Sequence, residues 1–340
     1  MSSQSKKPLG IAIVGCGMIS QYHLAALQNI DLYRICGVYD YSLEIAKKTA
    51  TEFGTNAYPF YEELLSDPNV DVVDICLPSG YHAEYGLMAI KAGKDIIVEK
   101  PIDVTLENAE KLIETCNQLN RKIAVIFQNR FTDAAIKIKK VLEANLLGPI
   151  IAVEASVKWY RNPTYYSSSN WKGTSKLEGG AMLNQGIHTI DLLLWFMGEV
   201  KSISALVRTA LHPIEAEDLS IVLLEFQNGA IGTLTVSTAL KPGFPERIEI
   251  YGQMGSLILE AGKIIHWDIE GTDSSNYLDN IEQGGSGSSN PAGIPLENHQ
   301  KQLTVIAEAL IIGSEPPVNG PEALKSLKLV HDIYAANHKR

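Results

Sequence analysis

A lysine ends an otherwise apolar run in the first half of the chain. The stretch "DIIVEKP" (Asp95–Pro101) places Glu99 and Lys100 directly after three β-branched residues, and Pro101 restricts the backbone that follows. In an open parallel sheet, ligands bind beyond the carboxyl ends of the strands. An ammonium group there can stabilise the negative charge that develops on a hydroxyl oxygen when a hydride leaves its carbon. A surface lysine at a strand end looks the same in sequence, so the run alone leaves both interpretations open.

A second set of polar residues interrupts an apolar helix-like stretch, "EGGAMLNQGIHTIDLL" (Glu178–Leu193). On an α-helix Asn184 and His188 are four residues apart and share one face, which Asp191 extends. Histidine is the side chain best suited to accept a proton near neutral pH. A core histidine beside an apolar stripe is the alternative interpretation. No metal is expected, because no third His or Cys lies near in sequence and Asn is a poor zinc ligand.

A glycine-rich turn, "VGCGMIS" (Val14–Ser20), follows the first apolar run. Gly15 permits a tight turn, and Gly17 lets the backbone approach a pyrophosphate beside the helix N-terminus that starts at Met18 and Ile19. Ser20 replaces the usual third glycine or alanine of the G-x-G-x-x-G fingerprint. A structural turn without a ligand is the alternative interpretation.

An aspartate, Asp40, lies 25 residues after Gly15 and ends the run "RICGVYD". Its carboxylate can accept hydrogen bonds from both hydroxyls of a ribose and would repel a 2′-phosphate. Tyr41 and Ser42 follow it, so no arginine compensates that repulsion. The pattern predicts NAD rather than NADP as cofactor. An aspartate that only opens the turn before the next helix is the alternative.

Alternating strands and helices position these residues. A chain of 340 residues suggests two domains at roughly 150 residues each. From residue 10 to residue 128, short β-branched runs alternate with amphipathic segments, which predicts an α/β domain with a doubly wound parallel sheet of the Rossmann type. The expected strands lie within residues 10–17, 33–40, 70–78, 95–101 and 122–128, and the expected helices within 20–28, 42–53, 81–92 and 105–120, the last with Thr105 as N-cap. We therefore expect an NAD-binding domain over residues 1–128.

The remaining residues, 129–340, show a different pattern of apolar and polar residues. Alternating apolar and polar residues over 150–160, 200–211, 219–240 and 246–267 predict a large open, mainly antiparallel sheet in an α+β domain, and "QNGA" (Gln227–Ala230) marks a hairpin. Helices are expected near 133–147, 180–197, 297–312 and 320–338, with the C-terminal helix able to pack back on the first domain. The Gly/Ser-rich stretch 282–295 is expected to be a loop.

Composition indicates which kinds of ligand and which cellular compartment to expect. The chain has 29 Lys and Arg against 39 Asp and Glu, a formal charge of −10, which disfavours nucleic acid and anionic membranes and favours a small-molecule ligand. The apolar runs are far shorter than the ~20 residues of a membrane helix. With no signal peptide visible, a cytoplasmic protein is expected. The four cysteines, Cys16, Cys36, Cys76 and Cys116, are spaced as reduced buried thiols rather than as disulfides or a zinc site.

Together these motifs resemble the Gfo/Idh/MocA family, the glucose–fructose oxidoreductase and inositol dehydrogenase group. The similarity covers nearly the whole chain and rests on "VGCGMIS", "CLPSGYH" (Cys76–His82), "EKP" and "GG…NQGIH…D", the last two together being the most specific. The resemblance implies that Lys100 is catalytic and assists cofactor placement, and that His188 accepts the proton. Members similar to inositol dehydrogenase have an aspartate where this chain has Asn184. Asn184 is therefore expected to orient the substrate or His188 rather than to form a carboxylate–histidine relay.

The resemblance also implies further ligand contacts. Cofactor contacts are expected from Leu77, Pro78, His82, Glu99, Lys100 and Gln128. Substrate contacts are expected from Arg130, Tyr160, Trp171 and Lys172, together with Asn184 and His188. The aromatic rings of this set suit the C–H faces of a sugar, and an interface core would suit them as well.

The implied function is that of an NAD(H)-dependent dehydrogenase acting on CH–OH groups. The expected substrate is a carbohydrate secondary alcohol in a pyranose, with C3 of a glycoside or nucleotide sugar as one candidate position, and its hydroxyl lies between Lys100 and His188. A homodimer or homotetramer is implied, built through the open faces of the second domain's sheets. Inositol or a trans-dihydrodiol is an alternative substrate. A non-catalytic protein that senses NAD and sugar is an alternative of another class, disfavoured by the presence of both Lys100 and His188.

Overall fold

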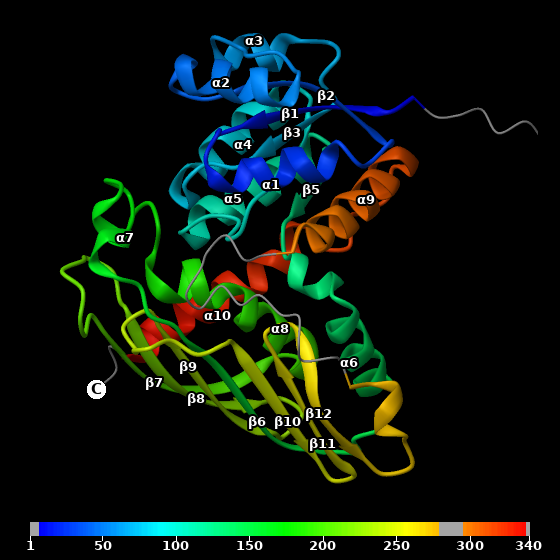
Figure 1. The fold of residues 1–340 in the computed structure, drawn as a ribbon, viewed down its shortest axis with the longest axis vertical. Helices are drawn as coiled ribbons and strands as arrows, with labels where there is room; N and C mark the ends of the chain where they lie inside the picture. The colour runs from blue at the N-terminus through cyan, green and yellow to red at the C-terminus, as the bar shows by residue number, and fades with distance from the viewer. Residues whose placement is uncertain (1–6, 279–294, 338–340) are drawn as a thin grey trace, which may run out of the picture. The chain divides into compact units, whose positions relative to one another are not determined.

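The computed structural model describes residues 7–278 and 295–337 (Figure 1). The chain divides into two compact units, residues 1–128 with 296–324 and residues 129–295 with 325–340. Among the described helices, none is both long and apolar enough to cross a lipid bilayer. The loop expected over residues 282–295 lies outside the described residues, apart from Pro295.

The first unit contains a five-stranded parallel sheet in the order β2-β1-β3-β4-β5. The strands are β1 (Leu9–Val14), β2 (Tyr33–Tyr39), β3 (Val72–Ile75), β4 (Asp95–Val98) and β5 (Ile123–Val125). Nearly all residues of β1, β3, β4 and β5 are buried, which is why their sequences read as continuous apolar runs. The predicted Rossmann-type sheet is confirmed.

Helices follow the strands of this sheet in chain order, as expected for right-handed crossovers. They are α1 (Met18–Leu27), α2 (Leu43–Phe53), α3 (Tyr61–Ser66), α4 (His82–Lys91) and α5 (Leu106–Gln118), with a 3₁₀ turn at Ser79–Tyr81. The side chain of Thr105 accepts a hydrogen bond from the N–H of Asn108 and caps α5, as predicted. The short α3 was not predicted, because six residues with adjacent acids show no helical apolar stripe.

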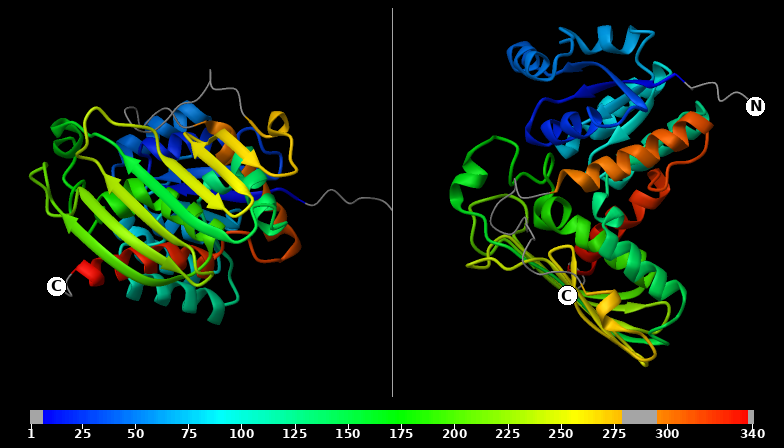
Figure 2. Two further views of the ribbon diagram at one scale, coloured as in Figure 1. Left: turned by 90° about the horizontal axis from the view of Figure 1, so that it is seen from below. Right: turned by 45° about the vertical axis from the view of Figure 1, so that its right-hand side comes forward.

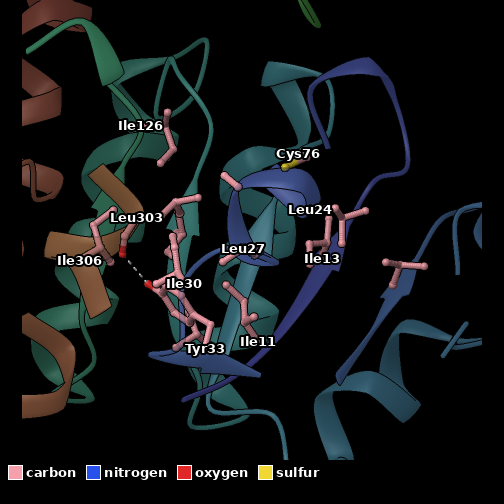
Figure 3. Close-up of a cluster of buried hydrophobic side chains, with 14 of the residues drawn as sticks. Ile11, Ile13, Leu24, Leu27, Ile30, Tyr33, Cys76, Ile126, Leu303 and Ile306 are labelled. Carbon is pink, nitrogen blue, oxygen red and sulfur yellow. Dashed lines mark hydrogen bonds between the residues drawn. The ribbon is translucent and has the colours of Figure 1, made fainter. Parts of the chain in front are cut away.

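A helix from the far end of the sequence completes the first unit. Helix α9 (Leu296–Ile312) packs on α1, with Leu303 and Ile306 in the same buried cluster as Leu24 and Ile30 (Figure 3). The hydroxyl of Tyr33 donates to the carbonyl oxygen of Leu303 over 3.1 Å. Residues 296–324 therefore lie with the first unit, although the predicted second domain ran from 129 to 340 and only the last helix was expected to pack back. Helix α10 (Gly320–Asn337) crosses the division between the units.

The second unit contains a seven-stranded sheet in the order β12-β11-β10-β6-β9-β8-β7. The strands are β6 (Ile150–Lys158), β7 (Val200–Arg208), β8 (Leu219–Phe226), β9 (Ile231–Ser237), β10 (Arg247–Gly252), β11 (Gly255–Glu260) and β12 (Lys263–Ile269). All neighbouring pairs are antiparallel except β6 and β9. The mainly antiparallel sheet and the "QNGA" hairpin between β8 and β9 are both confirmed.

The two faces of this sheet differ in what covers them. Along β8, Val222, Leu224 and Phe226 are buried, whereas Ile221 and Leu223 between them are exposed. The buried face packs against α8 (Ile187–Met197), which contacts β6 and β10. Figure 2 shows the opposite face turned toward the viewer in the view from below. The period-2 pattern of the sequence thus predicted a sheet with one exposed face.

The helices of the second unit are α6 (Asp133–Glu143), α7 (Pro163–Ser167), α8 and the end of α10, with 3₁₀ turns at Gln128–Phe131 and Ser274–Asn276. A π-helical turn, Met182–Gly186, precedes α8. The sequence predicted one continuous α-helix over 180–197, so the π turn is a correction. The turn packs tightly on the sheet, since a Cβ added at Gly186 would lie 2.7 Å from the side chain of Val236.

Candidate active-site residues

The glycine-rich turn forms a backbone cradle at the start of α1. Gly15 has a φ of +93°, and a Cβ there would lie 2.7 Å from the carbonyl oxygen of Cys76, so conformation and space both require glycine. Gly17 has a φ of −78°, and a Cβ there would meet no atom within 4 Å. Neither strain nor packing explains Gly17, whereas a ligand that approaches the backbone does. No described side chain caps α1, so the N–H groups of its first turn, at Met18 and Ile19, suit an anion.

Ser20 takes the third position of the fingerprint without disturbing it. Its side chain is fully buried, and Oγ donates to the carbonyl oxygen of Gly17 over 2.7 Å. The hydroxyl is therefore satisfied inside the turn, and α1 still packs closely on the sheet.

Asp40 lies beside the cradle at the end of β2. One carboxylate oxygen accepts the N–H of Cys16 and the other accepts the N–H of Ser42, both over 2.9 Å. Each oxygen retains a further lone pair, so these bonds orient the carboxylate and leave it able to accept ribose hydroxyls. Asp40 thus also opens the turn before α2, as the structural alternative supposed.

His82 joins the loops that follow β3 and β4. Its ring is fully buried, with Nδ1 2.7 Å from the carbonyl oxygen of Pro101 and Nε2 2.8 Å from that of Leu77. Burial lowers the pKa of His82, and the two carbonyl oxygens act in the opposite direction. The ring thereby holds the loop of Leu77 and Pro78 beside the turn at Lys100, whose bond to Pro101 is cis.

Glu99 and Lys100 lie just past the carboxyl end of β4. Glu99 is buried and Lys100 half-buried. One oxygen of Glu99 accepts the backbone N–H of Lys100 over 3.0 Å, and the other lies 3.0 Å from Nε2 of His23. Burial by itself would raise the pKa of Glu99, but the hydrogen bond and charge of His23 lower it to about 2, so the carboxyl group is ionised.

Gln128 lies three residues past β5, at the carboxyl edge of the sheet. Its side chain is buried, and its Oε1 has no hydrogen-bond partner among the residues that the structure describes. A donor on a bound ligand would satisfy such an acceptor. Together with the cradle at Gly17, this acceptor makes this unit fit a nicotinamide dinucleotide.

The sequence did not predict a role for His23, which contacts Glu99, or for Asp74, which contacts His23. His23 lies in α1, and its Nδ1 is 2.7 Å from a carboxylate oxygen of Asp74 in β3. The signals were present in the sequence, since Asp74 is an acid inside the apolar run "VDVVDICLP" and His23 is a lone histidine in a helix of small and apolar residues. A buried acid in a central strand requires a partner, although sequence does not say which.

In the second unit, Asn184 and His188 are the half-exposed residues of a buried stretch. All the other residues from 178 to 193 are buried. Asn184 lies in the π-helical turn and His188 in the first turn of α8. Turns of the π type occur frequently at functional sites. The chain thus exposes two predicted site residues and buries their neighbours.

Glu178 and Tyr165 hold Asn184 and were not predicted. The amide nitrogen of Asn184 donates to the buried carboxylate of Glu178 and lies 3.4 Å from the hydroxyl of Tyr165. That hydroxyl also receives the side-chain amide of Gln185 over 3.2 Å. The contacts point the amide nitrogen of Asn184 toward Glu178, so its oxygen is directed away from that carboxylate.

Arg130 and Asp191 form a buried ion pair within the same unit. Nε and Nη2 of Arg130 each donate to a different oxygen of Asp191 over 2.7 Å, and Ser326 also donates to Asp191 over 3.1 Å. Asp191 therefore anchors α8 instead of extending an exposed polar row. Arg130, expected to contact substrate, has two of its donors on Asp191.

In and around the aromatic segment after β6, lysine and arginine side chains lie over the faces of aromatic rings. Nζ of Lys172 lies 4.1 Å from the ring centroid of Tyr165 and 5.8 Å from that of Trp171. The guanidinium of Arg161, which was not predicted, lies 4.8 Å from the ring of Trp159. Lys241 similarly lies over Tyr160, at 4.9 Å. Tyr160, Trp171 and Lys172 are all half-buried, as side chains that line a binding surface are.

Glu217 is buried behind the π-helical turn. One of its carboxylate oxygens accepts the N–H of Met182 over 2.7 Å, and a Cβ added at Gly180 would lie 1.7 Å from the other. Burial raises the pKa of Glu217 to about 8, so the side chain is protonated at neutral pH. Gly180 is therefore required by the position of this acid as well as by its φ of +88°.

The four cysteines of the chain are all buried and free, as predicted. Burial raises the pKa of Cys16, Cys76 and Cys116 to about 12, so these thiols stay protonated. Protonated buried thiols are poor nucleophiles.

A Rossmann-type sheet with an open glycine cradle, an acid at the end of β2 and a polar pair on a second unit define an NAD(P)-dependent oxidoreductase. Two family models match the chain. The model described as an oxidoreductase family with an NAD-binding Rossmann fold matches residues 9–127, and that of the GFO/IDH/MocA C-terminal domain matches residues 135–258. The chain belongs to the Gfo/Idh/MocA family.

Individual relatives agree with this assignment. The myo-inositol 2-dehydrogenase of Thermotoga maritima is 29% identical over 79% of this chain and 81% of its own length. The scyllo-inositol 2-dehydrogenase (NADP(+)) IolW of Bacillus subtilis is 24% identical over 94% of this chain and 91% of its own. The crystal structure of the WlbA dehydrogenase of Bordetella pertussis, in complex with NADH and UDP-GlcNAcA, is 27% identical over 97% of this chain and 96% of that chain, with a TM-score of 0.89. This chain is thus an NAD(P)-dependent, sugar dehydrogenase-like oxidoreductase, as predicted.

Proposed function

We propose that the protein transfers a hydride between a secondary alcohol of a pyranose and NAD, with Lys100 and His188 acting on the reacting hydroxyl. The exposure of Asn184 and His188 alone within the buried stretch 178–193 carries the proposal. A core histidine, the alternative interpretation, has no reason to remain half-exposed where every apolar neighbour is buried. Residues 1–128 then serve the cofactor, and the unit that starts at residue 129 serves the substrate and oligomerisation.

Each residue has one task in the proposed reaction. In the oxidation direction His188 accepts the proton of the substrate hydroxyl, and the ammonium of Lys100 stabilises the charge that develops on the same oxygen. Bound NAD supplies the acceptor for the hydride that leaves the carbon. One O–H bond and one C–H bond break and a ketone forms, with the proton left on His188. Asn184, held by Glu178, orients the hydroxyl or the imidazole through its side-chain oxygen.

For the substrate, we propose a nucleotide-linked pyranose oxidised at C3. The half-buried rings of Tyr160 and Trp171 suit the C–H faces of a sugar, and the cation of Lys172 suits an anionic substituent. The WlbA structure, one of the better matches in coverage and TM-score, is a complex with UDP-GlcNAcA. An inositol is the alternative substrate, because one relative is a myo-inositol 2-dehydrogenase.

The test is a substrate panel. Nucleotide sugars, free sugars, glycosides and inositols are mixed with protein and NAD, and the absorbance band of reduced nicotinamide is followed. We expect turnover with a nucleotide sugar and none with the His188→Ala protein. Turnover with inositols alone would replace the substrate assignment, and NADH binding without turnover on any member would favour a sensor.

The exposed face of the seven-stranded sheet supports the proposal of a homo-oligomer. Ile221, Leu223 and Ile231 on adjacent strands β8 and β9 are 51%, 59% and 62% exposed, and Tyr251 on β10 extends the apolar surface across Ala152 of β6. Contiguous exposed apolar surface of this kind marks an interface, and we propose a second copy of the chain as its occupant. Light scattering should show a dimer or tetramer that Leu223→Glu dissociates. Phe60→Glu, at an exposed apolar residue of the other unit, should leave the mass unchanged, and a monomeric wild type would contradict the proposal.

A further inference from the structure

His23 lies between two buried carboxylates beneath the "EKP" turn. Its Nδ1 is 2.7 Å from an oxygen of Asp74 and its Nε2 is 3.0 Å from an oxygen of Glu99. His23 and Asp74 are fully buried, and Glu99 is nearly so. An ionised carboxylate only accepts hydrogen bonds. If both carboxylates are ionised, both ring nitrogens of His23 donate, and a ring with two N–H groups is an imidazolium.

The surroundings of His23 fit a cation. Burial by itself would lower its pKa, but the charge of Asp74 and its hydrogen bond raise it well above the ordinary value. The other titratable groups that face the cluster are Cys76, whose Sγ lies 3.6 Å from Nδ1, and His299 of α9, whose ring centroid lies 5.5 Å away. Burial and the charge of Asp74 raise the pKa of Tyr33, and Lys100 acts on Glu99. The cations of His23 and Lys100 thus balance the two carboxylates.

We propose that His23 is a positioning residue for Lys100: as a cation fixed between Asp74 and Glu99, it holds the Glu99 carboxylate ionised where it receives the Lys100 backbone N–H. The ionised Glu99 in turn favours the ammonium form of Lys100, the form that can stabilise a developing alkoxide. The catalytic part of this inference rests on the role proposed above for Lys100.

The same side chains also meet the geometric condition for a metal site. Ligand atoms of His23, Glu99 and His299, and separately of His23, Asp74 and Cys76, lie within 4.8 Å of one another. A metal ligand must be a neutral ring nitrogen without its proton. The separations of 2.7 and 3.0 Å at the two nitrogens are those of N–H···O hydrogen bonds instead, so we infer a proton-bound cluster.

The protonation of His23 can be tested without any assay of activity. In protein labelled with ¹⁵N-histidine, the His23 signals, assigned by their loss in His23→Gln, should be those of an imidazolium at neutral pH, above the ordinary histidine pKa of about 6.5. Metal analysis of the purified protein should find no stoichiometric metal. A neutral His23 ring at pH 7, or one bound metal ion per chain, would overturn the proposal.

Kinetics and cofactor binding then separate positioning from folding. In His23→Gln, Glu99→Gln and the double variant, Lys100 loses its ionised neighbour, so the alkaline limb of the kcat/KM profile should move down by about one pH unit. The double variant restores a neutral hydrogen-bonded pair, so its Tm should exceed that of His23→Gln while its pH profile stays shifted. A network that is only structural would change Tm and leave the alkaline limb in place.

Lys94→Met is the matched control, because Lys94 is a buried cation at the opposite end of β4 whose Nζ donates to the carbonyl oxygens of Asp67 and Val70. It should lower Tm without shifting the profile. If the wild type turns over no sugar, the proposed function fails, and NADH binding still tests His23. The Kd for NADH should rise about tenfold in His23→Gln and Glu99→Gln and stay unchanged in Lys94→Met, and an unchanged Kd in all three would refute the positioning role.

Discussion

Asn184 donates its amide nitrogen to the buried carboxylate of Glu178, which lies behind it in the second unit. Relatives similar to inositol dehydrogenase are expected to have an aspartate at position 184, and this chain places a carboxyl group in contact with that position instead. Glu178 orients the amide, so the oxygen of Asn184 is directed away from that carboxylate.

This relationship predicts the effect of exchanging the amide for an acid. Asn184→Asp places two carboxylates in contact, so one of them must take up a proton. We expect kcat/KM to fall about tenfold near pH 7, and to fall less in Asn184→Asp/Glu178→Gln, where one charge is removed again. Steady-state kinetics of the two proteins test this. Equal loss in both would show that the Glu178 contact does not matter.

Replacement of Lys100 tests the residue at the end of β4. Lys100→Met removes the cation that stabilises the developing charge on the substrate oxygen, and kcat should fall by about 10³-fold. Thermal unfolding should show a folded protein, because Lys100 is half-buried at a strand end rather than in the core. Turnover equal to that of the wild type would exclude the proposed role.

Replacement of His188 tests the proposed base. His188→Ala should lose most of its turnover, and the remaining activity should no longer depend on a group that titrates near neutral pH. The pH dependence of kcat/KM from about pH 5 to 9 is the measurement. An acid limb that persists unchanged in the variant would assign the base to another residue.

Asp40 should determine which nicotinamide cofactor is preferred. Its carboxylate is fixed by the N–H groups of Cys16 and Ser42, so a 2′-phosphate would meet an oriented negative charge. The wild type should have the higher kcat/KM with NAD, and Asp40→Ser should shift the NAD/NADP ratio by about tenfold or more toward NADP. A wild type that prefers NADP, as the name of the scyllo-inositol 2-dehydrogenase (NADP(+)) IolW indicates for that relative, would overturn the assignment.

Local signals predicted much of the fold because they depend on neighbouring residues. The β-branched runs of β1 to β5, the Thr105 cap and the "QNGA" hairpin need no information from elsewhere in the chain. The return of α9 to the first unit depends on Leu303 and Ile306 meeting Leu24, more than 270 residues earlier. The parallel pairing of β6 with β9 likewise joins segments 79 residues apart, from Ala152 to Ile231. Local periodicity carries no information on contacts between residues so far apart in the sequence.

The residues of the candidate site also fall into two groups: those that local sequence predicts and those that only the fold brings together. Gly15, Gly17 and Lys100 were visible because their types are unusual at their positions in the pattern. The partners that fix the site come from distant elements: His23 meets Asp74 across 51 residues, and Asp191 meets Arg130 across 61. The buried acids could be recognised from sequence as needing partners, but only the fold selects which cation or amide each one meets.

Glu217 should make stability fall as pH rises. Its pKa is about 8 in the folded chain, against an ordinary value of 4.5. The folded state therefore keeps a proton that the unfolded chain releases above about pH 4.5, and the stabilisation from that proton is lost as pH rises toward 8.

Glu217→Gln keeps an acceptor for the N–H of Met182 without a titrating group. The difference in Tm between wild type and Glu217→Gln should thus change in favour of the variant between about pH 5 and 9, measured by thermal unfolding across that range. A Tm difference that does not change with pH would show that Glu217 is ionised in the folded chain at neutral pH.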